Sequence, residues 1–350
     1  MENILPNLHL SDFDYALPAD RIAQTPLDKR DSSRLLVLDR ADHSLTHRRF
    51  TDLPEYLRPG DVLVLNDTRV TAQRLFGARP GHPDERLEAF LTERVADGLW
   101  QALVRPGKKW LPGAIVEFAD GLSAETLERT DDRGGRLLRF FGPEGVYIED
   151  AIARNAQAPL PPYIQTLLPP ENRERYQTVY ADQGGSAAAP TAGLHFTPEL
   201  LASIEARGVK IARVTLHVGM GTFRPIKTED ISAHEMHAER YSVSEEAAEI
   251  VNSAAGRIFA VGTTSALTLE SAAIGPRRIA AREGETSLYV TPGYEFQVVD
   301  ALITNFHMPR STLLLLVSAL AGTEFIRQAY RAALEGEYRF LSFGDAMLIV

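Results

Sequence analysis

The apolar residues of the chain follow three successive spacings, and each spacing predicts a different kind of structure. Residues 1–70 are mostly loop-like, with a short helix near Leu53–Leu57 and a buried strand at Asp61–Leu65. Residues 71–143 hold short runs of alternating apolar and polar residues, separated by turns rich in glycine, proline and aspartate. This spacing is typical of a small antiparallel barrel or sandwich. Its strands are expected at 87–92, 100–104, 114–118, 126–129 and 136–141.

From about residue 144 helices and strands alternate, which predicts an α/β fold: a mostly parallel sheet with flanking helices. Since the β-rich run interrupts an otherwise α/β pattern, we predict that residues 1–70 and 144–350 form one discontinuous catalytic domain. Residues 71–143 are then an inserted β-barrel-like domain. Helices are expected at 144–157, 198–207, 244–256, 265–273, 311–321 and 323–335, and strands at 209–216, 257–262, 286–290 and 298–303.

The composition narrows the class of protein. The 350 residues are 44% hydrophobic and 24% charged, as in soluble globular proteins. No run of 18 apolar residues and no basic, apolar leader is present, so we expect a cytoplasmic protein without membrane contact. The absence of cysteine excludes disulfides, thiolate catalysis and cysteine-ligated metals. The net charge of −10 argues weakly against a nucleic-acid partner, although it can conceal a local basic patch.

Five of the nine histidines fall between residues 195 and 307, among glycines, threonines and carboxylates. Such segments supply proton donors and acceptors and let the backbone come close to a ligand, and a catalytic site requires these properties. His195 lies in a run of small residues, His217 lies at a strand end before Gly219-Met220-Gly221-Thr222, and His307 follows Asn305 in a loop after a strand. A tightly packed loop or a hydrogen-bonded core histidine remains the alternative at each position.

A second pattern is the apolar strand that runs into Gly262-Thr263-Thr264-Ser265 and then into a helix. The N-terminus of that helix would face the end of the strand with free N–H groups and a positive dipole end. An anion fits there, either a phosphate or an amino-acid carboxylate. Plain capping of the helix by a hydroxyl is the alternative.

The segment His234-Glu235-Met236-His237-Ala238-Glu239 places two histidines three residues apart, which brings them together if the segment is helical. With Glu239 they could form a facial metal triad, contact substrate and transfer protons, or lie on a solvated face. Near the C-terminus, Arg339 and Asp345 either pair with each other or belong to the site.

Taken in order, these motifs resemble those of the S-adenosylmethionine:tRNA ribosyltransferase-isomerases of queuosine synthesis. The resemblance covers essentially the whole chain and is most specific in four blocks. These are residues 188–197 (AAPTAGLHFT), 215–223 (TLHVGMGTF), 304–312 (TNFHMPRST) and 344–347 (GDAM); shorter matches include 12–18, 66–70, 159–164 and 176–180.

The resemblance implies transfer of the ribosyl part of S-adenosylmethionine onto 7-aminomethyl-7-deazaguanine at the wobble position of tRNA. Epoxyqueuosine-tRNA, adenine and methionine are the products. It also implies an α/β domain with an inserted β-barrel-like domain and the site between them. The implied partners are tRNA that carries the aminomethyl base and S-adenosylmethionine as co-substrate, with no metal, no further cofactor, no membrane and a monomeric enzyme.

That chemistry needs a base for the protons beside the sulfonium, an acid for the departing adenine and a base for the attacking amine. We expect His234, His237 and Glu239 to handle protons, Thr263, Thr264 and Ser265 to hold the methionyl or ribosyl part, and Asp67 and Arg69 to meet the base or its phosphate. The candidate catalytic residues are His217, His234, His237, Glu239, His307 and Asp67. The candidate substrate-binding residues are Arg69, Thr191, Gly193, His195, Gly219, Gly221, Thr222, Thr263, Thr264, Ser265, Glu270, Asn305 and Asp345.

The chain departs from the family pattern at two residues. Leu267 stands where the family usually carries arginine, and Gln73 replaces a small residue before Arg74.

Two other classes of protein stay open on the residues alone: a metal-dependent hydrolase built on His234, His237 and Glu239, and a non-catalytic RNA-binding module. Local basic groups that could receive RNA are Arg48-Arg49, Arg69, Arg74, Arg105, Lys108-Lys109 and Arg173–Arg175.

Overall fold

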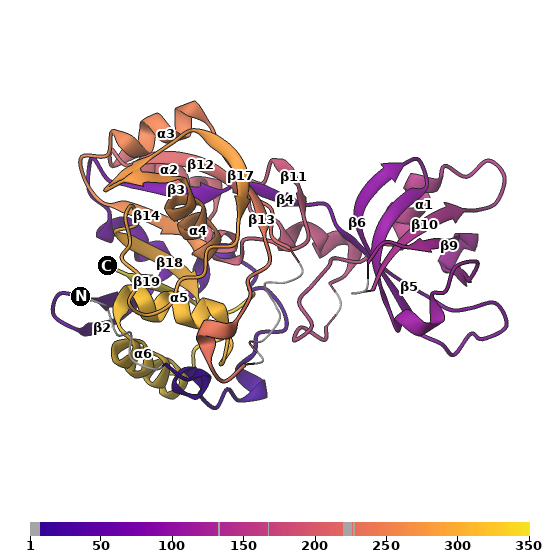
Figure 1. Ribbon diagram of the computed structural model, residues 1–350. Helices are drawn as coiled ribbons and strands as arrows, with labels where there is room; N and C mark the ends of the chain where they lie inside the picture. The colour runs from indigo at the N-terminus through magenta and orange to yellow at the C-terminus, as the bar shows by residue number, and fades with distance from the viewer. Residues whose placement is uncertain (1–7, 132–133, 167, 220–225, 227) are drawn as a thin grey trace.

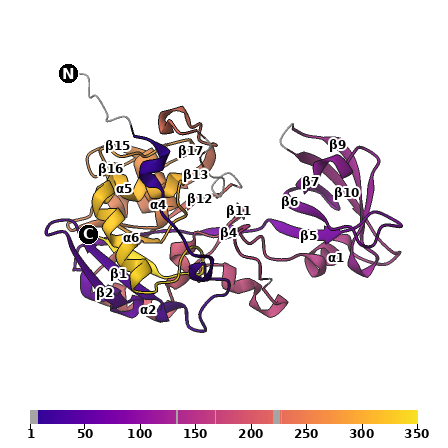
Figure 2. The same cartoon turned by 90° about the horizontal axis from the view of Figure 1, so that it is seen from below.

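The computed structural model describes residues 8–131, 134–166, 168–219, 226 and 228–350. It has a larger lobe, which carries the C-terminus, and a smaller β-rich lobe (Figures 1 and 2). The two lobes are joined by the region around β4 (Thr68–Val70) and β11 (Gln183–Ser186), which pair in parallel.

A nine-stranded sheet forms the centre of the larger lobe, in the order β17-β13-β12-β3-β14-β18-β19-β1-β2. The four neighbours β12, β3, β14 and β18 run parallel to one another, whereas β13, β17, β19 and β2 bring antiparallel pairings to the flanks. The expected parallel-rich α/β fold is therefore confirmed for the middle of the sheet, and its flanks are mixed. The strands are β1 (Arg34–Asp39), β2 (Ser44–Arg49), β3 (Val62–Asn66), β12 (Lys210–Leu216), β13 (Glu239–Val243), β14 (Ile258–Val261), β17 (Arg282–Thr286), β18 (Ala301–Asn305) and β19 (Ala346–Ile349).

Both faces of this sheet are buried at its centre, which explains why β3 is a continuous apolar run rather than an alternating one. Val62 and Val64 pack in one core with four helices, and Leu63 and Leu65 pack in a second core on the opposite face. The first core is covered by α3 (Glu245–Asn252), α4 (Gly262–Ala272), α5 (Thr312–Ala321) and α6 (Thr323–Glu335), and the second by the 3-10 helices η4 (Phe50–Tyr56) and η8 (Thr191–His195) and by α2 (Pro198–Ala206).

The smaller lobe is one antiparallel sheet in the order β5-β6-β7-β10-β9-β8. It curls so far that its two edges meet at a single bridge between Ala78 and Glu117, with N–H to O distances of 2.8 and 2.9 Å. The strands are β5 (Gln73–Gly77), β6 (Leu87–Ala96), β7 (Leu99–Arg105), β8 (Ile115–Glu117), β9 (Ser123–Arg129) and β10 (Gly135–Phe141).

Helix α1 (Ile148–Asn155) packs on the smaller sheet, where Ala151 and Ile152 share a core with Trp100 and Leu138. The predicted domain boundary after residue 143 therefore assigns α1 to the larger domain, although the apolar face of α1 belongs to the core of the insertion. The nine-stranded sheet, in turn, combines strands from residues 34–66 with strands from residues 210–349.

The predicted strand at 286–290 is wrong, because β17 ends at Thr286 and residues 287–290 are irregular. Leu288 and Val290 are apolar because they pack on the core of the larger lobe, not because they alternate along a strand. β17 itself is a polar edge strand, so its sequence carries no apolar signal. A short hairpin of β15 (Ala273–Gly275) and β16 (Arg278–Ile279) precedes it.

No single helix in the described part of the chain is long and apolar enough to cross a membrane. The consecutive helices α5 and α6 reach that length only together, and they are bent by 113° relative to each other.

Gly193 in η8 permits a close approach between the second core and the segment before β11. A Cβ atom there would lie 2.1 Å from the hydroxyl oxygen of Tyr180 and 2.7 Å from the Cγ2 atom of Thr178. We expect Gly193→Ala to lower the free energy of unfolding by roughly 1–3 kcal/mol, as overpacking does, measured by urea denaturation. Gly107→Ala is the control, since its Cβ would meet nothing nearer than 3.6 Å. Equal losses in the two variants would contradict this account.

Candidate active site at the ends of the parallel strands

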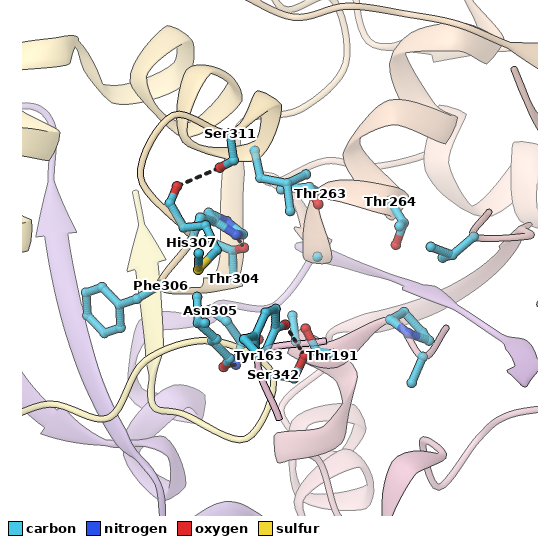
Figure 3. Close-up of a pocket in the computed structure, with 18 of the residues that line it drawn as sticks. Tyr163, Thr191, Thr263, Thr264, Thr304, Asn305, Phe306, His307, Ser311 and Ser342 are labelled. Carbon is cyan, nitrogen blue, oxygen red and sulfur yellow. Dashed lines mark hydrogen bonds between the residues drawn. The ribbon is translucent and has the colours of Figure 1, made fainter. Parts of the chain in front are cut away.

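The carboxyl ends of the central parallel strands meet at one edge of the large sheet, where ligands bind in open α/β sheets. Two cavities open there. The first, of about 380 Å³, is lined by the loop after β18, the first turn of α4, η8 and the segment around Tyr163 (Figure 3). The second, of about 350 Å³, is lined by residues 233–239, by 288–290 and by α4 and α5. Thr263, Thr264 and Leu313 line both cavities, so the two are contiguous.

The first turn of α4 forms the wall that the cavities share. Gly262 begins the helix with a φ of +85°, a conformation that glycine adopts without strain, and no side chain caps the helix. Capping by a hydroxyl, the alternative weighed from the sequence, is therefore not observed. The N–H groups of this turn and the positive end of the helix dipole suit an anion.

The hydroxyls of this turn have different surroundings. Thr264 lines both cavities, and its Oγ1 atom is buried and makes no hydrogen bond. Ser265 is fully buried and donates to the carbonyl of Val261 at 2.8 Å, so its hydroxyl is used within the helix. Thr263 and Thr264, rather than Ser265, are thus the members of the predicted trio that line the cavities.

His307 enters the first cavity in the loop that follows β18 (Figure 3). Its Nε2 atom lies 2.9 Å from the hydroxyl of Thr304, and burial lowers its pKa to about 3, which keeps the ring neutral. The backbone is fixed on both sides: its N–H donates to the hydroxyl of Tyr330 at 2.9 Å, and its carbonyl accepts from the hydroxyl of Tyr15. The N-terminal motif around Tyr15 therefore acts by holding this loop.

Asn305 lines the first cavity and is oriented from behind by His195. The Nδ2 atom of Asn305 donates to the carbonyl of Leu341 at 3.0 Å and to Nε2 of His195 at 3.3 Å. The other ring nitrogen, Nδ1, then carries the proton and donates to the hydroxyl of Ser33 at 2.8 Å. Because both amide N–H contacts are fixed, the Oδ1 atom of Asn305 remains a buried acceptor without a protein partner.

His195 itself lies behind the wall of the first cavity. It is buried, stacked on Phe50 with ring centroids 4.9 Å apart, and burial lowers its pKa to about 4. This neutral ring positions Asn305 and does not line the first cavity.

The second cavity gathers His234, His237 and Glu239, as the sequence pattern predicted. The segment is not helical, because residues 234–238 are irregular and β13 starts at Glu239, so the two histidines reach one cavity without a helical turn between them. Burial and the nearby His237 lower the pKa of His234, whose ring lies 5.5 Å from that of Tyr289. Glu239 accepts from the N–H of Gly219 at 2.8 Å, which links this cavity to the loop after β12. Among the described residues, no three His, Asp or Glu side chains converge as metal ligands do.

His217 and Asp67 line neither cavity and form a separate polar cluster beside β4. The Nδ1 atom of His217 lies 2.9 Å from the hydroxyl of Thr68, and Asp67 accepts from the hydroxyl of Thr215 at 2.7 Å. Burial lowers the pKa of His217 and raises the pKa of Asp67. This cluster lies where β4 leads into the smaller lobe.

Several other predicted residues hold the fold together and line neither cavity. The carboxylate of Glu270 accepts from the N–H groups of Gln297, Val298 and Val299 at 2.8–3.0 Å. Asp345 accepts from the N–H groups of Arg34 and Arg339 at 2.8 Å each, so it joins the starts of β1 and of the C-terminal turn. Gly193, packed on Tyr180, Arg69, which pairs with Glu174 at 3.0 Å on the surface, and Gly219 line neither cavity as well.

Thr191 does line the first cavity, whereas Gly221 and Thr222 lie outside the described residues. Tyr163 and Ser342, which are not among the predicted site residues, face Thr263 and Ser311 across the first cavity (Figure 3). Their hydroxyls are 2.7 Å apart, and burial raises the pKa of Tyr163 to about 12. Tyr163 stands in the quoted segment 159–164, but nothing local in the sequence brings it to Ser342.

Leu267, one of the two departures from the family pattern, lies on α4 and lines the second cavity next to Leu316. An apolar surface therefore stands where an arginine is usual. Gln73 begins β5, away from both cavities.

Comparison with known proteins gives the context for this site. Residues 10–349 match the model of a family described as queuosine biosynthesis protein. The chain belongs to this family. It is 54% identical over 346 residues to the S-adenosylmethionine:tRNA ribosyltransferase-isomerase of Symbiobacterium thermophilum and 50% identical over 347 residues to that of Desulfitobacterium hafniense; each match covers 98% of this chain and all of the relative. The crystal structure of S-adenosylmethionine tRNA ribosyltransferase from Thermotoga maritima is also similar, with 39% identity, a TM-score of 0.55, and coverage of 97% of this chain and all of that one.

The family membership and the names of these relatives support the transferase interpretation of the motifs. Neither the metal-dependent hydrolase nor the non-catalytic RNA-binding module receives support from them.

The neutral His195 predicts how stability depends on pH. Its pKa is about 4 in the folded protein against 6.5 for an ordinary histidine, so between these values only the unfolded chain binds the proton. Stability should therefore fall as the pH falls from about 6.5 to about 4, by up to ~1.4 kcal/mol per pH unit from this group. Urea denaturation of His195→Gln should give a flatter curve in this window, and the exposed His82→Gln should follow the wild type. Coincident curves for His195→Gln and wild type would refute the role of the ring.

Proposed function

We propose that this protein is an S-adenosylmethionine:tRNA ribosyltransferase-isomerase. It transfers the ribosyl part of S-adenosylmethionine onto 7-aminomethyl-7-deazaguanine at the wobble position of tRNA and releases adenine and methionine. The observation that carries the proposal is the identity of 50–54% over essentially full length to relatives of that name. The enzyme acts as a cytoplasmic monomer, needs no metal, and uses no cofactor beyond S-adenosylmethionine as co-substrate.

S-adenosylmethionine spans the two contiguous cavities, with its methionyl or ribosyl part against Thr263 and Thr264. Each cavity lies at the lower end of the size range of small-molecule sites, and together they suit an elongated ligand. The uncapped first turn of α4 receives the carboxylate. The unpartnered Oδ1 atom of Asn305 and Oγ1 atom of Thr264 offer further polar contacts.

Proton transfer is assigned to the residues that line these cavities. The reaction needs a base that removes a proton beside the sulfonium, an acid that protonates the departing adenine, and a base that keeps the amine uncharged. Each positioned group contributes about 10²–10⁴ in rate. His234 suits the role of base, since its lowered pKa keeps the ring neutral, and His237 and Glu239 complete the group in the second cavity. Burial lowers the pKa of His307 so far that its neutral ring is a weak base, so His307 contacts the substrate as a hydrogen-bonding group in the first cavity.

The modified base enters from the junction of the lobes, where Asp67, Arg69 and His217 lie close to β4. The curled sheet of residues 73–141, with α1, acts as an inserted barrel-like domain that faces the tRNA. Support comes from the course of the chain, which leaves the larger lobe after β4 and returns before β11.

The decisive assay supplies S-adenosylmethionine and tRNA that bears the aminomethyl base and measures free adenine by chromatography. We expect adenine release that depends on this tRNA and persists in excess chelator. Loss of activity in chelator would favour the hydrolase alternative, and tRNA binding without adenine release would favour the RNA-binding module.

In the same assay His237→Ala should lower turnover by at least about 10²-fold, because a positioned proton-transfer group is lost. Unchanged turnover would remove His237 from the proton-transfer group.

Removal of the Thr264 hydroxyl should weaken substrate binding without lowering the stability of the fold. Since its Oγ1 atom has no protein partner, Thr264→Val should leave the free energy of unfolding nearly unchanged and should raise KM for S-adenosylmethionine roughly tenfold, the worth of one hydrogen bond. Thr268→Val on the same helix is the matched control: it loses a bond to the carbonyl of Thr264, 2.9 Å away, so it should lose stability instead. An unchanged KM in Thr264→Val would exclude this contact.

A further inference from the structure

A third, smaller hollow adjoins the active site and is lined by two arginines, Arg30 and Arg175. Its volume is about 30 Å³, enough for the oxygen atoms of an anion and too small for a base or a nucleoside. Ser342 lines both this hollow and the first cavity, and His195, also in its wall, bonds to Asn305 in the first cavity. The hollow and the first cavity are therefore separated by a single layer of side chains.

Two guanidinium groups from distant parts of the chain line this hollow, and a third, that of Arg339, lies close to its wall. Arg30 belongs to the 3-10 helix η3 (Arg30–Ser32), Arg175 to η7 (Pro170–Tyr176), and Arg339 lies in the C-terminal turn. Burial, and after it the charge of Arg175, lowers the pKa of Arg30, and the charges of Arg30 and Arg339 both act on His195. Like charges repel one another, so such a cluster is costly unless an anion occupies it.

Backbone carbonyls, not carboxylates, hold these arginines in place. Arg30 donates to the carbonyls of Leu194 and Glu174 at 3.3 and 3.0 Å, and Arg175 donates to those of Asp28 and Leu27 at 2.9 and 2.5 Å. Arg339 donates to the carbonyl of Thr25, next to Pro26 in the wall of the hollow. The Nε atom of Arg175 and the Nη1 atom of Arg339 are buried without a partner. The forks are thus oriented, with donors and full charge left over.

Two carboxylates in the neighbourhood act electrostatically on this cluster, Glu174 on Arg30 and Asp345 on Arg339, but neither forms an ion pair with it within 4 Å. Glu174 directs its carboxylate to Arg69 at 3.0 Å and is largely exposed. Asp345 is buried but bonds to the backbone N–H groups of Arg34 and Arg339. Among the described residues, Arg30, Arg175 and Arg339 form no ion pair within 4 Å, in contrast to Arg69, Arg74 and Arg79.

We propose that the hollow of Arg30, Arg175 and Arg339 binds one backbone phosphate of the tRNA next to the nucleotide that enters the first cavity. The inference rests on the proposed function and adds the point at which the acidic protein holds its RNA. Arginine forks match the paired oxygens of a phosphate. The shared wall at Ser342 places that phosphate within reach of the reacting nucleotide. The contact fixes the position of the RNA and carries no sequence information.

The test compares Arg175→Gln with Arg40→Gln. Arg40 is a matched control, because it too is partly buried, donates only to backbone carbonyls and lines none of these cavities. We expect Arg175→Gln to weaken binding of the tRNA about tenfold and to make the slope of log K against log salt shallower by roughly 0.7–0.9, the share of one phosphate. Arg40→Gln should change neither, and KM for S-adenosylmethionine should stay the same in both variants.

A second measurement keeps the test independent of any loss of folding in the variant. Stem-loop RNAs that bear the aminomethyl base receive one neutral methylphosphonate at each phosphate near that base in turn. At one position the neutral linkage should weaken RNA binding by the wild type about tenfold. Arg175→Gln should bind that RNA no more weakly than it binds the unmodified RNA. If every neutral linkage weakens both proteins equally, or if Arg175→Gln keeps the wild-type salt slope, the phosphate site is wrong. Failure of the proposed function is a different result, namely wild-type protein that binds tRNA and releases no adenine.

Discussion

The side-chain amide of Asn305 is the interaction on which the arrangement of the site depends. Its N–H groups bond to Nε2 of His195 and to the carbonyl of Leu341, so one side chain joins the end of β18, the helix η8 and the C-terminal turn. These bonds lie in a buried region, where an unsatisfied polar group is costly and a satisfied one fixes a single geometry. The buried, neutral state of His195 maintains the acceptor that Asn305 needs.

Much of the polar sequence that looks catalytic serves this positioning. Glu270 and Asp345 bind backbone N–H groups, and Tyr15 and Tyr330 fix the backbone on either side of His307. The polar atoms left without protein partners in the cavity walls are few, and they include Oγ1 of Thr264 and Oδ1 of Asn305. A rigid frame with a few unused donors and acceptors is the arrangement expected where binding must orient a reactive nucleoside.

The charge distribution resolves the apparent conflict between an acidic chain and an RNA substrate. The net charge of −10 is an average over the molecule, whereas RNA contacts need only local arginines. Arg69, Arg74 and Lys109, which the sequence suggested, pair with carboxylates. Arg175, which the sequence also suggested, forms no ion pair among the described residues, and neither do Arg30 and Arg339. All three lie at or near the hollow beside the first cavity, so they are better placed to receive a phosphate.

The sequence by itself determined the class of fold and the segments that hold the site. The continuous apolar run of β3, the helical pattern of α2–α6 and the glycine-hydroxyl turn at Gly262 depend on local chemistry, and the structure has them within a few residues of the expected positions. The predicted strand at 286–290 failed, because Leu288 and Val290 are apolar for packing on the core and not for alternation along a strand.

Only the tertiary structure decided which polar residues share a cavity. His195 and Asp345 stand in specific motifs yet lie behind the cavity walls, whereas Tyr163 and Ser342, 179 residues apart, meet across a hydrogen bond. Their meeting depends on how the two cores pack on the sheet, and no spacing along the chain encodes that distance. The same is true of Arg30, Arg175 and Arg339, which are scattered in the sequence and gathered by the fold.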